Sequence, residues 1–102
     1  MSPYIDDRRA ALEELCRRYR VRRLFLFGSA VRDDFDPGRS DVDLLVEFEP
    51  MPAGGYADAY FGLRDALEAL FGREVDLVAL SALRNPYMRA DIERTRTLLY
   101  AA

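Results

Sequence analysis

Apolar side chains recur at helical spacing in two stretches of the chain, residues 4–19 and residues 57–71. Positions three or four apart share one face of a helix, so each stretch predicts an amphipathic helix. Shorter runs rich in β-branched and aromatic residues predict strands at 21–27, 41–48 and 74–80. In the second helix the apolar side carries Tyr60, Leu63, Leu67, Leu70 and Phe71, with Gly72 following as a C-terminal cap.

Asn85-Pro86 is a typical helix start, and we expect a last helix from there to about residue 95. Residues 97–101 fit either a last strand or a frayed end. This order of elements predicts an α+β fold, in which helices pack mainly on one face of a small mixed β-sheet. The chain has 102 residues and no linker-like tract, so we expect one domain, residues 1–102.

The composition narrows the chemistry that the chain can perform. It has no histidine and a single cysteine, Cys16, which excludes Ser-His-Asp and Cys-His catalysis and an internal disulfide. A net charge of −3 gives no basic footprint for direct nucleic-acid binding. The N-terminal segment lacks a signal-peptide pattern and no apolar run is long enough to span a bilayer, so we expect a cytoplasmic protein.

Paired carboxylates open the second predicted strand. Asp41 and Asp43 lie two residues apart and therefore share one face, while the alternating apolar residues share the other face. Carboxylates this close repel each other unless a cation or proton lies between them, and their oxygens suit Mg²⁺ or Mn²⁺. If the second and third strands are neighbours, Asp76 stands beside Asp43 and completes a candidate two-metal site. Each acid taken alone is also consistent with an ordinary structural role, Asp41 as a turn residue and Asp76 as an exposed residue of a half-buried strand.

Gly28-Ser29 ends the first predicted strand. Glycine lets a phosphate approach the backbone, the serine hydroxyl adds a donor, and Arg32 could reach the same anion. Taken alone, Gly28-Ser29 is more typical of an ordinary strand-to-helix turn with a serine cap, and neither a Walker A loop nor a G-x-G-x-x-G motif is present. Beside three acids, a phosphate-binding turn favours metal-assisted phosphoryl or nucleotidyl transfer.

As a set, these motifs resemble the signature of the DNA polymerase β-type nucleotidyltransferase superfamily, most closely its minimal members, the MNT domains. The set comprises Gly28-Ser29, an eleven-residue spacer, Asp41-Val42-Asp43 and then Asp76. The resemblance implies that the three aspartates hold Mg²⁺ or Mn²⁺ and that Asp76 helps to deprotonate the acceptor. It also implies that Gly28 and Ser29 bind the β- and γ-phosphates of ATP, the co-substrate, and that Arg32 and Arg39 contact phosphate or acceptor.

Minimal MNT proteins are typically antitoxins paired with HEPN ribonuclease toxins. The resemblance therefore implies transfer of AMP from ATP to a tyrosine of such a toxin, within a hetero-oligomer of the two proteins. Three alternatives stay open: an antitoxin that neutralises its toxin by binding alone, a nucleotidyltransferase with another acceptor, and a nucleotide-binding sensor without turnover.

Overall fold

The computed structural model describes residues 6–27, 42–52 and 54–102 of the chain. Within these ranges, the helices and strands follow the order that the apolar pattern predicts. The last stretch, which fitted either a strand or a frayed end, is a strand. The elements in chain order are α2 (Arg9–Arg18), β1 (Val21–Phe27), β2 (Val42–Phe48), α3 (Gly55–Phe71), β3 (Val75–Ala79), the 3₁₀ helix η2 (Leu80–Ala82), α4 (Pro86–Thr95) and β4 (Thr97–Ala101).

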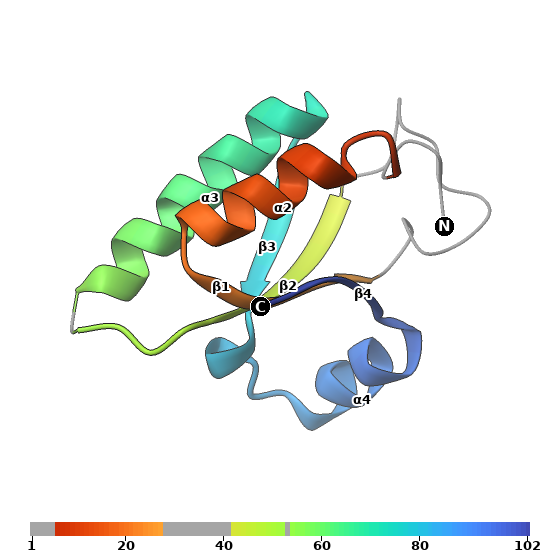
Figure 1. Ribbon diagram of the computed structural model, residues 1–102. Coiled ribbons are helices and arrows are strands. Elements are labelled where there is room, and N and C mark those ends of the chain that lie inside the picture. Colours follow the sequence, from red (N-terminus) through yellow and green to blue (C-terminus); the bar gives the residue numbers. More distant parts are fainter. Residues whose placement is uncertain (1–5, 28–41, 53) are drawn as a thin grey trace.

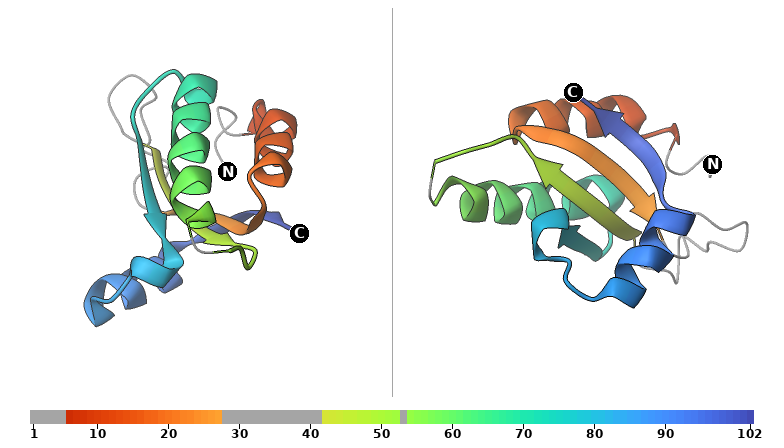
Figure 2. Two further views of the ribbon diagram at one scale, coloured as in Figure 1. Left: turned by 90° about the vertical axis from the view of Figure 1, so that its left-hand side faces the viewer. Right: turned by 90° about the horizontal axis from the view of Figure 1, so that it is seen from below.

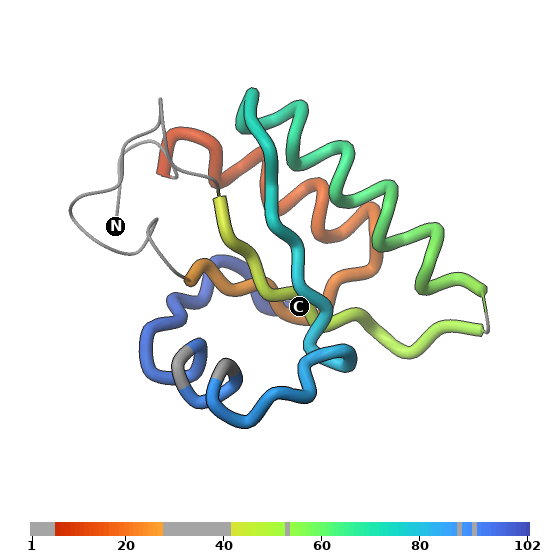
Figure 3. Tube along the Cα trace, turned by 180° about the vertical axis from the view of Figure 1, so that it is seen from behind, coloured from red at the N-terminus to blue at the C-terminus, as the bar shows by residue number. Residues whose placement is uncertain are grey.

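The described strands form one mixed sheet in the order β3-β2-β1-β4. β1 runs antiparallel to both β2 and β4, whereas β2 and β3 are parallel. Parallel strands need a long crossover, and α3 supplies it between β2 and β3 (Figure 1). The second and third strands are therefore neighbours, which is the condition that the expected carboxylate site required (Figure 3).

Helices α2 and α3 lie side by side over one face of the sheet, and α4 lies on the opposite side (Figures 1 and 2). The main core fills the space beneath α2 and α3. This arrangement confirms the predicted α+β fold with helices mainly on one face. The buried residues of the main core are Leu12, Cys16, Val21, Leu24, Leu26, Val42, Leu44, Val46, Leu63, Leu67, Phe71, Val75, Leu77 and Leu99.

A smaller core lies on the opposite face of the sheet. Phe25, Phe27 and Leu45 of the sheet pack there against Leu83 and Ile92. This second cluster holds α4 and the segment after η2 against the strands, because Ile92 belongs to α4 and Leu83 directly follows η2. No helix in the described ranges is long and apolar enough to cross a membrane.

The first helix differs from the expected residues 4–19. Residues 1–5 lie outside the described part of the chain, and the regular helix α2 begins only at Arg9. Arg8 adopts φ −107° and ψ 5°, outside the helical region, and its Nε donates to the carbonyl of Leu70 in α3 at 3.3 Å. Asp6 is helical, so the expected helix is interrupted by a turn at Asp7 and Arg8. The long-range contact of Arg8 accompanies this interruption, and the helical pattern does not encode that contact.

The other boundaries agree closely with the sequence pattern. α3 begins at Gly55 rather than at residue 57, and β3 ends at Ala79 because Leu80 already belongs to η2. Gly72 caps α3 in the left-handed conformation, with φ 67°, as expected of a C-terminal glycine. The Asn85 side chain accepts a hydrogen bond from the Tyr87 N–H at 2.9 Å, which confirms the predicted start of α4.

Candidate active site

Asp43 and Asp76 are direct register partners in the parallel pair of β2 and β3. Each is the second residue of its strand, and each lies between residues that belong to the main core. Because side chains alternate along a strand, both carboxylates lie on the face opposite α2 and α3. Asp43 is half-buried and Asp76 is exposed.

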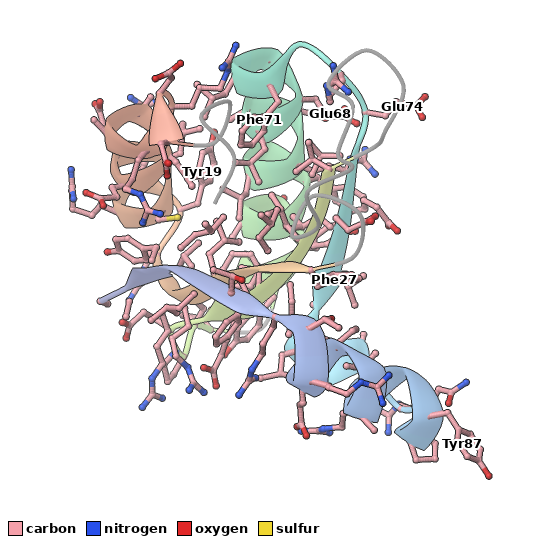
Figure 4. The ribbon with its side chains drawn as sticks, turned by 90° about the vertical axis from the view of Figure 1, so that its right-hand side faces the viewer. Tyr19, Phe27, Glu68, Phe71, Glu74 and Tyr87 are labelled. Atoms are coloured by element: carbon pink, nitrogen blue, oxygen red, sulfur yellow. The ribbon has the colours of Figure 1, made fainter. Side chains whose placement is uncertain are left out.

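The end of β1 lies beside Asp43, on the side of β2 away from Asp76. Phe27, the last residue of β1, pairs with Asp43 across the antiparallel ladder (Figure 4 labels Phe27). The residue that follows Phe27 in the sequence is Gly28, the first member of the Gly-Ser pair. The described strands thus bring three chain positions to one end of the sheet: the exit from β1, Asp43 and Asp76.

Five of the predicted site residues lie outside the described residues. They are Gly28, Ser29, Arg32, Arg39 and Asp41. Their roles in phosphate and metal binding therefore stay predictions. The structure does describe the other two acids, Asp43 and Asp76, and it places them next to each other on β2 and β3.

The two described carboxylates fit a hard divalent cation. Neighbouring strands lie about 4.8 Å apart, so carboxylates at register positions on one face can reach a common ion. Among the described residues no group of three histidine, cysteine or acidic side chains is placed to hold a metal ion. The third acid of the predicted set, Asp41, is not among those residues, so Asp43 and Asp76 form the described part of the set.

A hollow of about 390 Å³ adjoins the start of β3. It is lined by Arg64 and Glu68 of α3 and by Glu74, Val75 and Asp76. Figure 4 shows Glu68 and Glu74 close to the point where α3 ends and β3 begins. This hollow lies between α3 and the start of β3, and Asp76, which borders it, is exposed.

A second hollow, of about 660 Å³, lies at the opposite end of the same strands. Its walls include Val46 and Phe48 of β2, Ala79 of β3, and the arginines Arg84 and Arg89. Neither Asp43 nor Asp76 lines it. The carboxylate pair and this larger hollow are therefore separate features of the sheet.

Two side chains of α3 hold the strand that carries Asp76. The N–H of Val75 donates to Glu68 Oε2 at 3.1 Å, and the Tyr60 hydroxyl donates to the carbonyl of Leu77 at 2.6 Å. Sequence reasoning placed Tyr60 on the apolar side of α3 and assigned no role to Glu68. The available signal was the hydroxyl itself, because a tyrosine on a buried helix face needs a polar partner.

Cys16, the single cysteine, is not a candidate nucleophile. Its side chain is part of the main core. Burial, reinforced by the nearby Glu13 and opposed by Arg17, raises the pKa of the thiol to about 12. The thiol is therefore protonated at neutral pH, and the thiolate is the reactive form.

The comparison with protein families identifies the class of protein to which this fold belongs. The profile of the nucleotidyltransferase domain family matches residues 8–99. The chain belongs to this family, which confirms the expected class of enzyme.

Two relatives carry names that specify the reaction further. Protein adenylyltransferase MntA of Thermococcus cleftensis is 42% identical over 73 residues, which cover 72% of this chain and 70% of the relative. "Putative protein adenylyltransferase MJ0128" of Methanocaldococcus jannaschii is 41% identical over 76 residues, which cover 74% of each chain.

Solved structures share the fold. The chain is similar to "Structure of putative minimal nucleotidyltransferase", with a TM-score of 0.74, 35% identity, and coverage of 91% of this chain and 90% of the other. This likeness confirms the minimal nucleotidyltransferase fold.

Two more distant structures come from toxin–antitoxin complexes. One is described as a tri-AMPylated Shewanella oneidensis HEPN toxin in complex with MNT antitoxin, with a TM-score of 0.66, 18% identity, and coverage of 95% of this chain and 72% of that one. The other is described as the toxin-antitoxin with AMP-PNP, with a TM-score of 0.68, 20% identity, and coverage of 92% and 73%. At these identities the likeness shows the fold alone.

Proposed function

We propose that the protein is a metal-dependent adenylyltransferase that acts as an antitoxin. It transfers AMP from ATP to a tyrosine of a HEPN-type toxin and so inactivates that partner. The observation that carries the proposal is the register pairing of Asp43 with Asp76, beside the end of β1. The names of the two protein adenylyltransferase relatives support AMP as the transferred group.

In this proposal Asp41, Asp43 and Asp76 hold Mg²⁺ or Mn²⁺. The bound ion supplies charge neutralisation on the phosphates and a lower pKa for the attacking hydroxyl. These carboxylates suit the ion because hard oxygen ligands bind it best, and because the ion offsets the repulsion between neighbouring acids.

The chain's other residues bind and orient the substrates. Gly28 and Ser29 bind the β- and γ-phosphates, and Arg32 and Arg39 contact phosphate or acceptor. The tyrosine oxygen attacks the α-phosphorus, the bond from that phosphorus to the bridging oxygen breaks, and pyrophosphate leaves. Asp76 accepts the proton of the tyrosine hydroxyl at a carboxylate oxygen. The exposure of Asp76 supports this role, because an acceptor carried by another protein must reach it.

The partner class is inferred from the complex of a tri-AMPylated HEPN toxin with an MNT antitoxin, whose antitoxin fold this chain shares. By this analogy the protein and its toxin form a hetero-oligomer. The toxin then supplies both the acceptor tyrosine and the surface that presents it to Asp76.

The test uses ATP labelled at the α-phosphate, Mg²⁺ and the product of the neighbouring gene. We expect label to move onto that product, and peptide mapping to find it on a tyrosine. Asp43→Asn should abolish transfer. Asp58→Asn is the matched control, because Asp58 is an exposed aspartate in the first turn of α3, at the opposite end of that helix from the start of β3, and it should transfer normally.

Two outcomes would contradict the proposal. Tight binding of the two proteins with no transfer of label would make this an antitoxin that acts by occlusion. Label found on a small molecule or a nucleic acid, rather than on the partner, would retain the enzyme class and overturn the acceptor.

A further inference from the structure

We propose that Tyr60 and Glu68 are positioning residues, which fix Asp76 beside Asp43 by holding the backbone on both sides of it. The inference rests on the proposed function in one respect, the role of Asp76 as a site carboxylate. In this inference α3 not only covers the sheet but also fixes the position of Asp76 relative to Asp43.

β3 is an edge strand, hydrogen-bonded to β2 on one side. Along such a strand, backbone polar groups alternate between the paired side and the open side. The carbonyl of Glu74 accepts from the N–H of Val42, so the polar groups of alternate residues starting at Glu74 face β2. Asp76 is in this set. The polar groups of its two neighbours, Val75 and Leu77, therefore face the open side.

Both of these neighbours are bound by α3. Glu68 accepts from the N–H of Val75 at 3.1 Å, and Tyr60 donates to the carbonyl of Leu77 at 2.6 Å. The two bonds thus act on the residues immediately before and after Asp76. One uses a carboxylate acceptor, which makes the stronger, charge-assisted kind of hydrogen bond.

The side chains that make these bonds are themselves held in place. Tyr60 is half-buried and packs against the main core, and its ring meets that of Phe61 edge-to-face with centroids 5.2 Å apart. Glu68 is also half-buried and lies one position after the fully buried Leu67. Because α3 is anchored in the main core, its hydrogen bonds hold the backbone of β3 at a fixed position.

Geometry explains why this matters for the acid pair. Two carboxylates can share an ion only when each is held to within about 0.5 Å of its productive position. In the sheet formed by the described strands, β2 is fixed by a strand on each side, whereas β3 pairs with β2 alone. Asp76 is therefore the member of the pair whose backbone needs support from outside the sheet, and Tyr60 and Glu68 supply it.

The test compares variants that remove these bonds with variants that do not. Tyr60→Phe deletes only the hydroxyl, and Glu68→Leu deletes the acceptor. Glu68→Gln keeps an acceptor oxygen and serves as the conservative rescue. Tyr56→Phe is the matched control, because the Tyr56 hydroxyl accepts from the N–H of Met51 at 2.9 Å and its side chain lines the larger hollow, at the end of the strands away from Asp76.

Three quantities are measured on the full chain: Mn²⁺ affinity by electron paramagnetic resonance, kcat and KM for adenylyl transfer, and amide exchange at Val75. We expect Tyr60→Phe and Glu68→Leu to weaken Mn²⁺ binding and lower kcat about tenfold each, with little change in KM for ATP. Amide exchange at Val75 should accelerate in Glu68→Leu. Glu68→Gln and Tyr56→Phe should stay close to the parent protein.

The positioning role is overturned if Tyr60→Phe and Glu68→Leu match Tyr56→Phe in Mn²⁺ affinity and kcat, since both residues would then be structural only. An Asp76→Asn variant separates this failure from that of the proposed function. If Asp76→Asn abolishes transfer while the α3 variants do not, the positioning inference alone fails. If Asp76→Asn itself leaves Mn²⁺ binding and transfer unchanged, Asp76 is not a site residue and both proposals fail.

Discussion

The two faces of the sheet are built from the same strands but bury very different amounts of apolar side chain. Among the residues that the structure describes, fourteen buried ones form the main core under α2 and α3, whereas the face toward α4 has a cluster of five. The carboxylates of Asp43 and Asp76 lie on the second face, next to that small cluster. One face therefore supplies most of the stability, and the other leaves room for chemistry.

The difference arises from alternation along single strands. In β2, Val42 and Leu44 contribute to the main core while Asp43, between them, carries its carboxylate on the other side. The same holds for Asp76 between Val75 and Leu77 in β3. Burying the apolar partners on one face fixes the strand, and that also fixes the acids on the opposite face.

The largest expected effect on stability compares two adjacent leucines of β2. Leu44 lies in the main core and Leu45 in the small cluster, with relative exposures of 0% and 1%. We expect Leu44→Ala to lower the free energy of unfolding by about 3–4 kcal/mol and Leu45→Ala by about 2 kcal/mol, because the smaller cluster can close around its cavity. Urea unfolding of both variants measures the difference.

The pair is its own control, because both substitutions are made in the same strand and remove the same atoms. Equal losses of unfolding free energy at the two positions would show that the two faces contribute equally to stability, and would contradict the proposed difference between them. A larger loss at Leu45 would reverse it.

A smaller effect is expected at the end of α3. Gly72 holds a left-handed conformation with φ 67°, and nothing lies within 4 Å of the position that a β-carbon would occupy. Gly72→Ala should therefore cost about 1 kcal/mol through backbone strain alone. Gly72→Asn should cost less, because asparagine tolerates this region better. Thermal unfolding of the two variants tests the order, and a loss from asparagine equal to that from alanine would contradict it.

The smallest effect concerns Glu47 on the lightly covered face. Arg23 and Glu47 are register partners of β1 and β2, and the Arg23 Nε donates to Glu47 Oε1. This hydrogen bond lowers the pKa of the Glu47 carboxyl. A lowered carboxyl pKa stabilises the fold above the ordinary glutamate pKa, and that contribution is lost as the pH falls through the folded-state pKa.

Glu47→Gln should therefore change stability little at neutral pH, because the pair is exposed to solvent. It should also reduce the loss of stability between about pH 5 and pH 3, where the parent protein gives up this contribution. Urea unfolding across that range is the measurement. An acid response identical to that of the parent protein would show that the pair contributes nothing.

Much of the fold was predictable from the sequence, because apolar spacing and turn residues encode local structure. The strands, the cap at Gly72 and the helix start at Asn85 follow from such local signals. The pairing of Asp43 with Asp76 needed one further condition, that β2 and β3 be neighbours, and the structure meets it.

Long-range contacts of single side chains could not be predicted. Nothing in the apolar pattern indicates that Arg8 contacts the carbonyl of Leu70, or that Arg9 contacts the carbonyl of Leu99 on the edge strand β4. The same is true of Glu68 and the N–H of Val75. The bonds to Leu99 and Val75 depend on which backbone groups the sheet leaves open, and the bond to Leu70 uses a carbonyl in the last turn of α3. Which side chains reach these groups is known only once the packing of the elements is known.

The most direct test of the account makes one substitution on each face of the sheet and compares the two variants by two measurements. Adenylyl transfer and the free energy of unfolding are measured for Asp43→Asn and for Leu44→Ala. We predict that Asp43→Asn loses transfer by about a thousandfold, equivalent to about 4 kcal/mol of transition-state stabilisation. Its free energy of unfolding should change less than that of Leu44→Ala, because the Asp43 side chain belongs to neither buried apolar cluster. Leu44→Ala should lose stability and keep its transfer rate per folded molecule. Transfer that persists in Asp43→Asn would contradict the account.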